Sequence, residues 1–186
     1  MNQTLETIQK RFACRNYTGE PLPKEALEAI ALAAVEAPSA VNRQGWRVIV
    51  VTNPGLLREM EEEGLRVLRA MPDPSAFLRI QSRGGVLFYH APCIVFIAVD
   101  ASDRMTSAMD CGIVCENIAL AATSLGLGNV ICGLAGLIFS GEKADYFKKR
   151  LGFPEGFEFG CSVLLGTAAK LSDPHTPDRG KIRFVE

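Results

Sequence analysis

The spacing of apolar residues along the chain predicts a mixture of helices and strands. Apolar residues recur at intervals of three and four in the helical segments, whereas the strand segments are short runs rich in β-branched residues. The expected helices cover residues 4–12, 23–37, 54–70, 103–125 and 142–151, and the expected strands cover residues 47–52, 93–99, 129–131 and 157–166. Because these elements do not follow a strict βαβ alternation, the sequence predicts an α+β fold.

The expected helix over residues 103–125 is apolar on nearly all of its faces. Asp103 is placed to cap its first turn, Gly126 to end it, and apolar residues such as Ile113 and Val114 occupy successive positions around it. A helix that is apolar all round has to be buried all round. One chain of this size offers too little material for that, so we expect a second subunit to cover part of the helix.

Residues 71–90 form the least regular stretch between two expected elements. Two prolines and the pair Gly84-Gly85 interrupt any periodic pattern, and the aromatic pair Phe88-Tyr89 follows. Two interpretations stay open, a mobile cover over a pocket or a surface excursion without a role.

Length and composition are those of a single globular domain spanning residues 1–186. Of the 186 residues, 48% are apolar and 22% are charged, and the formal net charge is -1. This balance argues against disorder, nucleic-acid binding and attraction to an anionic membrane. No run approaches the ~20 apolar residues of a membrane span, and residues 1–4 show neither part of a signal peptide. We expect a cytoplasmic protein with no nucleic-acid and no membrane partner.

The chain has six cysteines, which in a cytosolic protein are expected to be reduced. Cys111 and Cys115 are four residues apart and share a helix face. A zinc site needs more ligands than these, and neither His90 nor His175 stands at ligand spacing, so no metal site is expected. Of the others, Cys93 and Cys161 lie inside apolar strand patterns and are expected to be small core residues.

The most informative chemistry lies between the second expected helix and the first expected strand, where residues 38–46 read Pro-Ser-Ala-Val-Asn-Arg-Gln-Gly-Trp. This link holds a hydroxyl (Ser39), two carboxamides (Asn42 and Gln44) and the only tryptophan of the chain (Trp46). Carboxamides both donate and accept hydrogen bonds, which suits the edge of a planar ligand such as a flavin ring. The alternative is an ordinary loop in which the carboxamides bond to the local backbone.

A second signal lies near the N-terminus, at Arg11 and Arg15. Spacing of four places both guanidinium groups on the same side of a helix that ends near Phe12. Converging arginines suit a phosphate, because the guanidinium fork matches phosphate oxygens. The alternative is a solvated basic face.

Together the two segments resemble the nitroreductase family of FMN-dependent oxidoreductases. The motifs that carry the resemblance are Arg11-Phe12-Ala13-Cys14-Arg15, residues 38–46, Ala91-Pro92, Asp110-Cys111-Gly112 and residues 124–128, so it covers nearly the whole chain. Three positions depart from the family pattern: Ala13 replaces a serine, Gly45 replaces a proline, and the stretch Asn129–Gly133 lacks the proline or tryptophan and the acidic residue of many relatives. The resemblance implies a central, mostly antiparallel sheet flanked by helices, a homodimer and bound FMN.

The resemblance also implies which residues hold the FMN. The phosphate is expected beside Arg11, Phe12, Ala13 and Arg15 and beside a basic residue of the C-terminal tail, with Lys181 the better match and Arg179 the alternative. The ring is expected to meet Pro38, Ser39, Ala40 and Asn42 from the other subunit, and Gln44 to meet its pyrimidine end or the ribityl chain. The turn Ile131-Cys132-Gly133 is expected to bring a backbone amide to flavin N5.

The implied activity is hydride transfer from NAD(P)H through flavin N5 to a nitroaromatic, quinone or similar acceptor in a ping-pong mechanism. The flavin carries this chemistry, so no catalytic side chain is expected. Alternatives on the same fold are a dehydrogenase, a reductive dehalogenase, an enzyme reduced by a protein donor such as ferredoxin, and an FMN-binding or redox-sensing protein with little turnover that uses Cys14 or Cys132.

Overall fold

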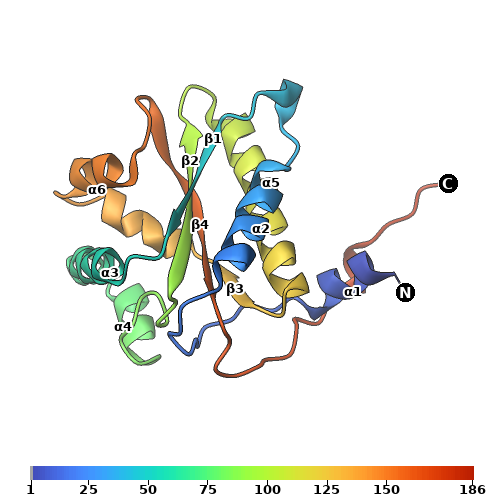
Figure 1. Cartoon of the computed structure of the whole chain (residues 1–186), viewed down its shortest axis with the longest axis horizontal. Coiled ribbons are helices and arrows are strands. Elements are labelled where there is room, and N and C mark those ends of the chain that lie inside the picture. The colour runs from blue at the N-terminus through green and yellow to red at the C-terminus, as the bar shows by residue number, and fades with distance from the viewer. Residues whose placement is uncertain (1) are drawn as a thin grey trace.

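Four strands form one antiparallel sheet in the order β1-β2-β4-β3 (Figure 1). The structure, a computed structural model, describes residues 2–186. The strands are β1 (Trp46–Val51), β2 (Cys93–Asp100), β3 (Gly128–Ile131) and β4 (Phe157–Gly166). The predicted α+β fold with an antiparallel sheet is confirmed, and each predicted strand lies within one residue of its observed bounds.

Helices cover both faces of this sheet (Figure 1). One face carries α2 (Lys24–Val35) and α5 (Arg104–Ser124), and the other carries α3 (Pro54–Arg69), α4 (Ser75–Gln81), α6 (Ala144–Leu151) and the 3-10 helix η2 (Gly133–Phe139). The remaining elements are α1 (Gln3–Lys10) and the 3-10 turns η1 (Ala40–Asn42) and η3 (Arg179–Lys181).

The central strand β2 supplies side chains to both layers, which explains its continuous apolar sequence. Ile94 and Phe96 pack in the core beneath α3, whereas Val95 and Ile97 pack in the core beneath α5. Successive side chains of a strand point to opposite faces, so a strand covered on both sides has to be apolar at every position. The sheet therefore separates two cores.

The long helix α5 begins and ends where the sequence predicts. The Asp103 carboxylate accepts a hydrogen bond from the backbone N–H of Thr106 (3.1 Å), and the helix stops at Gly126, whose φ is +74°. Its sheet-facing side is buried, but Met105 and Met109 on the other side are exposed. Within one subunit an apolar side of α5 thus stays open, and its burial against a second subunit stays a prediction.

Residues 71–90 contain a helix and end in buried residues. The stretch contains α4, and Leu87 and Phe88 are buried in the core beneath α3. Their backbone is held by Glu61 of α3, whose carboxylate accepts a hydrogen bond from the N–H of Leu87 (2.5 Å). Residues 87–89 thus belong to the packed core, whereas most of residues 71–86 lie on the surface.

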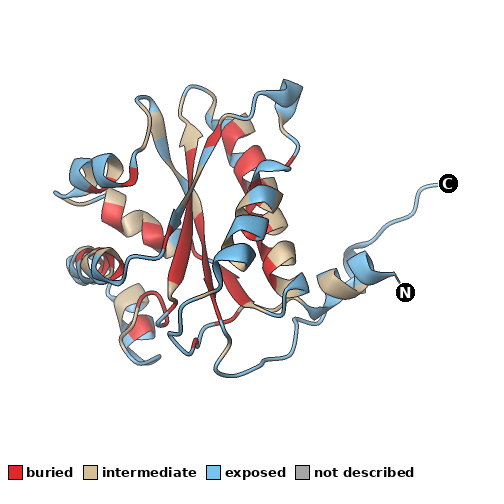
Figure 2. Cartoon of the chain, viewed as in Figure 1, coloured by how far each residue is buried: buried red, intermediate tan, exposed pale blue. Residues whose placement is uncertain are grey.

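Helix α1 lies beside the C-terminal end of α5, whereas the end of the C-terminal tail extends away from both layers (Figure 1). Figure 2 shows the whole tail and most of α1 as exposed, in contrast to the buried sheet. Both carry apolar residues on their exposed surfaces, including Ile8 in α1 and Ile182, Phe184 and Val185 in the tail. No helix within residues 2–186 combines the length and apolarity needed to cross a membrane.

Candidate functional site

The segment that holds Arg11 and Arg15 runs alongside the edge strand β3. Ala13 forms an isolated parallel bridge with Asn129, and the Cys14 N–H donates to the Asn129 carbonyl (2.8 Å). Gly128 makes this close approach possible, because a Cβ atom there would lie 2.8 Å from the Cys14 Sγ. The N-terminal segment is thus fixed against the sheet by strand-like contacts.

The helical spacing expected for the two arginines is wrong. Helix α1 ends at Lys10, and Arg11 already has an extended backbone, because the chain turns there to meet β3. Arg11 pairs with Glu116 of α5 at 3.7 Å. Arg15 is exposed, and its guanidinium donates only to the nearby Ala13 carbonyl at 3.5 Å. Among residues 2–186, no carboxylate forms an ion pair with Arg15, so its charge is available to a ligand.

The turn Ile131-Cys132-Gly133 follows β3 and lies next to this segment. Two hydrogen bonds lock it to β4: the Cys132 N–H donates to the Ser162 carbonyl, and the Ser162 hydroxyl donates to the Cys132 carbonyl, both at 2.8 Å. The Cys132 amide is therefore committed to the sheet. Beside Gly133 the space is open, since a Cβ atom there would meet no atom within 4 Å.

Arg15 is close enough to this turn to influence it electrostatically. Burial raises the pKa of the Cys132 thiol, and hydrogen bonds from the backbone of Ala135 and Leu134 and the charge of Arg15 act in the opposite direction. The structure thus brings together two of the predicted groups, the arginine segment and the turn, along one edge of the sheet. Phe12 and Ala13 are half-buried against the core at the same place.

The loop before β1 has a strained backbone. Val41, Asn42 and Gln44 have φ angles of +48°, +55° and +48°. These angles lie in the left-handed region, which residues other than glycine rarely adopt. Local hydrogen bonds brace it: the Ser39 hydroxyl accepts from the Gln44 N–H, and the Gln44 carboxamide donates to the Asn42 side chain, both at 2.9 Å. Strain of this kind tends to be kept at functional sites.

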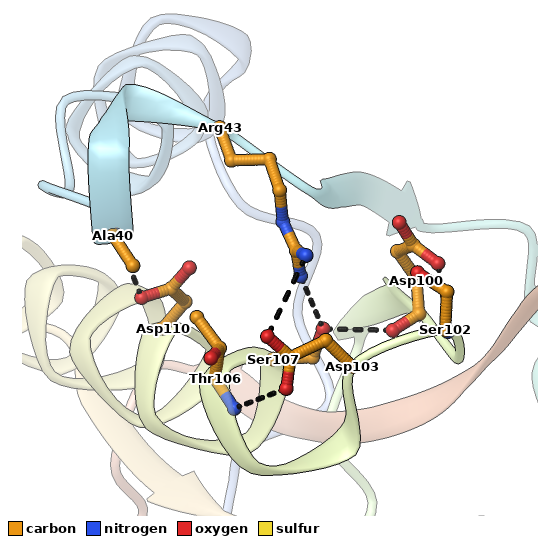
Figure 3. Close-up of polar contacts among 8 residues, drawn as sticks. All are labelled: Ala40, Arg43, Asp100, Ser102, Asp103, Thr106, Ser107 and Asp110. Carbon is orange, nitrogen blue, oxygen red and sulfur yellow. Dashed lines mark hydrogen bonds and ion pairs between the residues drawn. The ribbon is translucent and has the colours of Figure 1, made fainter.

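Three contacts fasten this loop to the N-terminal part of α5 (Figure 3). The backbone N–H of Ala40 donates to the Asp110 carboxylate (3.2 Å). Arg43 donates to the Ser107 hydroxyl (3.1 Å) and pairs with Asp103 at 3.7 Å. The Ser107 hydroxyl in turn donates to the Asp100 carbonyl (2.7 Å), which ties the same network to the end of β2.

Asp110 is the least expected member of this network. Its side chain is buried, and in the part of the chain that the structure describes its second oxygen, Oδ2, meets no hydrogen-bond donor. A buried carboxylate is costly and is retained where it holds something in place. The sequence offered one signal for this role, an acidic residue within an otherwise apolar stretch of helix.

One subunit does not unite the two halves of the expected site. The arginine segment and the Ile131-Cys132-Gly133 turn lie at the β3 edge of the sheet, whereas residues 38–44 lead into β1 at the opposite edge. The tail residues Arg179 and Lys181 are exposed in η3, which Asp178 caps by accepting from the Gly180 N–H (3.0 Å). Within residues 2–186, no ion pair or hydrogen bond joins either tail residue to Arg11 or Arg15.

Burial indicates which cysteines are accessible for a redox role. All six are free thiols, and Cys14 and Cys132 are buried, which argues against their use as exposed redox sensors. Cys161, expected to be a plain core residue, is instead half-buried. Residues 2–186 contain no cluster of three or more histidine, cysteine or acidic side chains arranged to hold a metal ion.

The sequence profile of the nitroreductase family matches residues 8–167. The chain belongs to the nitroreductase family. The match spans the arginine segment, the strained loop, α5 and the turn after β3, so every part of the candidate site except the tail lies within it.

Known relatives agree with this assignment. A nitroreductase from Desulfitobacterium hafniense, solved with bound FMN, is 53% identical and superposes with a TM-score of 0.98 over the whole of both chains. A second FMN-bound nitroreductase, from Bacteroides fragilis, is 29% identical with a TM-score of 0.89 over the whole of both chains. A Methanothermobacter thermautotrophicus protein with the provisional name NADH dehydrogenase/NAD(P)H nitroreductase is 31% identical, over 94% of this chain and 84% of its own length.

Proposed function

We propose that this protein is a homodimeric FMN-dependent oxidoreductase that uses NAD(P)H to reduce nitroaromatic, quinone or similar acceptors. The observation that carries the proposal is that Arg15, whose charge is available to a ligand, and the open space beside Gly133 lie along the same edge of the sheet. Relatives of this family with bound FMN and with nicotinamide-linked names support the same assignment.

The residues along β3 fit a flavin phosphate and the ring that follows it. Arg11 and Arg15 supply the charges for the phosphate, and Ala13 lets the phosphate approach the backbone without adding the hydroxyl that a serine would bring. The tail contributes Lys181 or Arg179 as a further cation. At the turn, Ile131 and the Gly133 backbone border the space for the ring, because the Cys132 amide is already bonded to Ser162.

The strained loop supplies the other wall of the site from the partner subunit. Pro38, Ser39, Ala40 and Asn42 contact the ring there, and Gln44 contacts its polar end. Val41, at the tip of the loop, is 95% exposed in one subunit, and Met105 and Met109 of α5 are also exposed on a neighbouring surface. Apolar side chains presented in this way favour burial against a second copy, and two-fold pairing is the commonest arrangement of such copies.

When bound, FMN supplies hydride transfer between a reduced nicotinamide and an oxidised acceptor. The protein's part is to hold the cofactor by its phosphate, to fix the ring between the turn and the partner's loop, and to leave one face open to small planar molecules. With a single open face, donor and acceptor use the same place in turn.

A mixed-subunit experiment tests whether the site is shared between subunits. Arg15→Ala and Asn42→Ala each disable a different half of the site, so each homodimer should lose most of its NAD(P)H-dependent reductase activity. In a heterodimer of the two variants, one site carries both defects and the other carries neither. Random mixing should restore about a quarter of the wild-type activity per subunit, whereas a site built within one subunit predicts no recovery.

A matched control separates the phosphate contact from loss of charge in general. Arg15→Ala should weaken FMN binding by about 1.5–3 kcal/mol, the range for a hydrogen bond to a charged group. Arg150→Ala removes an exposed arginine from the last turn of α6 and should leave FMN affinity unchanged. Equal FMN affinity in wild type and Arg15→Ala protein would contradict the proposed phosphate site.

A further inference from the structure

A hollow of about 630 Å³ lies at one end of the sheet, where β1 leads into α3. Its walls come from the chain around the start of α2, from the first half of α3 and from residues 88–92, which precede β2. Leu57, Arg58 and Glu61 line it together, because helix positions three and four residues apart share one side. The volume falls within the range of small-molecule binding sites.

The hollow is separate from the proposed flavin site. It borders Thr52, just after the end of β1, whereas the strained loop of residues 38–44 leads into the beginning of that strand. The arginine segment and the turn after β3 lie at the opposite edge of the sheet. Among the described residues that line the hollow, none is assigned to the flavin or to the surface that meets the partner subunit.

The walls of the hollow are apolar and stiff. Leucine side chains supply much of the apolar lining, and prolines, whose rings fix their own φ angles, limit the movement of the wall. The lining residues of these two types are Leu22, Leu27, Leu57, Pro21, Pro54 and Pro92. A preformed apolar wall suits the apolar body of a ligand, because little ordering of the protein has to accompany binding.

The chain before β2 makes a strained bend at this hollow. Tyr89 and His90 have consecutive φ angles of +54° and +62°, in the left-handed region that favours glycine. Two hydrogen bonds hold the bend: the Ala91 N–H donates to the Phe88 carbonyl (2.9 Å), and the Tyr17 N–H donates to the Tyr89 carbonyl (3.4 Å). Phe88 and His90 both line the hollow. Backbone strain that is held in this way tends to be found at ligand sites.

Two of the charged residues that line the hollow already have partners within the subunit. The Lys24 ammonium pairs with Glu28 at 3.3 Å. The Glu61 carboxylate accepts the hydrogen bond from the Leu87 N–H, and so holds the segment before β2. Burial raises the pKa of Glu61, although backbone hydrogen bonds and the charge of His90 act against this. Neither Lys24 nor Glu61 therefore offers a ligand an unopposed charge.

Arg58 is the charged residue of the hollow whose charge is available. It is exposed, and within residues 2–186 no carboxylate forms an ion pair with it. A guanidinium fork matches the two oxygens of a carboxylate. The imidazole of His90, which lines the same hollow, supplies a further hydrogen-bonding group. The free charge thus favours an anionic ligand group, and the leucines and prolines favour an apolar body attached to it.

We propose that this hollow is a second ligand site, which binds a small monocarboxylate by pairing its carboxylate with Arg58 and placing its apolar body against the leucines and prolines of the wall. The proposal does not rest on the flavin function, because the two sites share no assigned residue.

Titration of the purified protein, saturated with FMN, with octanoate tests the site. Octanoate carries a carboxylate on an apolar chain and has no planar ring to stack on a flavin. Amide NMR spectra of isotope-labelled protein report both the affinity and the place of binding. The dissociation constant should be about 1 mM or lower. The shifted amides should include those of Gly19, Leu57 and His90, which line the hollow.

Related ligands separate the carboxylate from the apolar body. Butanoate has the same charge and a shorter chain, so it buries less apolar surface and should bind at least about tenfold more weakly than octanoate. Octylamine has the same chain length and a positive charge, so it should also bind more weakly, because Arg58 repels it.

Variants of Arg58 complete the test. Arg58→Ala should weaken octanoate binding at least about tenfold, the effect of losing a hydrogen bond to a charged group. Arg58→Lys keeps the charge without the fork and should lose less affinity. Arg79→Ala removes an exposed arginine of α4 that does not line the hollow, and it should bind octanoate as wild type does. The proposal is overturned if octanoate shifts no amide of the hollow, if Arg58→Ala binds it as tightly as wild type, or if octylamine binds there more tightly than octanoate.

Discussion

Replacing Asp110 with alanine should loosen the strained loop and weaken FMN binding without unfolding the protein. Asp110 holds the Ala40 N–H at 3.2 Å, and this is one of three contacts that fasten the loop to the N-terminal part of α5. The left-handed residues Val41, Asn42 and Gln44 each cost about 1–2 kcal/mol, so the loop keeps its shape only while its contacts offset that strain.

The expected effect follows from the hydrogen bond that is lost. A hydrogen bond to a charged group contributes about 1.5–3 kcal/mol, and its length of 3.2 Å places this one at the lower end of that range. A loss of ~1.5 kcal/mol lowers the population of the binding-competent loop, and hence the FMN affinity, roughly tenfold. Global stability should change less, because the substitution also removes a buried carboxylate oxygen that has no hydrogen-bond donor.

Flavin fluorescence, which rises when FMN leaves the protein, gives the dissociation constant, and urea unfolding gives the stability. Asp110→Asn is the matched control, because it keeps a side-chain oxygen in place to accept from Ala40, and it should retain FMN within about threefold of wild type. The reasoning is refuted if Asp110→Ala binds FMN as tightly as wild type, or if the alanine and asparagine variants lose affinity equally.

Three other predictions follow from the same structure. Gly133→Val places a side chain in the open space at the turn, so FMN affinity should fall at least about tenfold while urea unfolding changes by less than about 0.5 kcal/mol; unchanged FMN binding would remove Gly133 from the site. Hydrogen bonds from Arg66 (2.7 and 2.8 Å) lower the pKa of the buried Glu63, so this pair stabilises the fold above about pH 4.5 and its contribution is lost as the pH falls through the folded-state pKa. Urea unfolding of Glu63→Gln should therefore show a smaller loss of stability on acidification than wild type, and equal losses would contradict this assignment. Steady-state rates with NAD(P)H and a quinone should give parallel double-reciprocal lines, because one open face serves both substrates; intersecting lines would require both to be bound together.

The sequence predicted the elements whose limits are set locally. Asp103 and Gly126 fix the ends of α5 by capping and by a left-handed turn, and both limits were found as expected. The strand over residues 157–166 also agrees with its prediction, and its apolar run Val163-Leu164-Leu165 lies in the half of the strand that is buried on both faces.

The failures arose where distant contacts override local patterns. The apolar spacing of α1 extends to Phe12, but the chain leaves the helix after Lys10 because Ala13 and Cys14 bond to β3. In the same way, the burial of Leu87 depends on its contact with Gly64 of α3, which no local pattern reveals.

The candidate site shows the same division. Residue types and motif order pointed to the arginine segment, the loop and the turn. The role of Asp110 as an anchor depends on how α5 packs against the loop. Such contacts join residues far apart in the chain, so spacing alone does not predict them.

The measurement that tests the central claim most directly is an anaerobic titration of the purified protein with NADH or NADPH, monitored by the visible spectrum of the flavin. The account predicts a yellow protein with about one FMN per subunit, whose flavin absorbance is bleached stoichiometrically by NADH or NADPH and restored by a quinone or nitroaromatic. A protein that stays colourless after incubation with FMN, or a bound flavin that neither nicotinamide reduces, would contradict it.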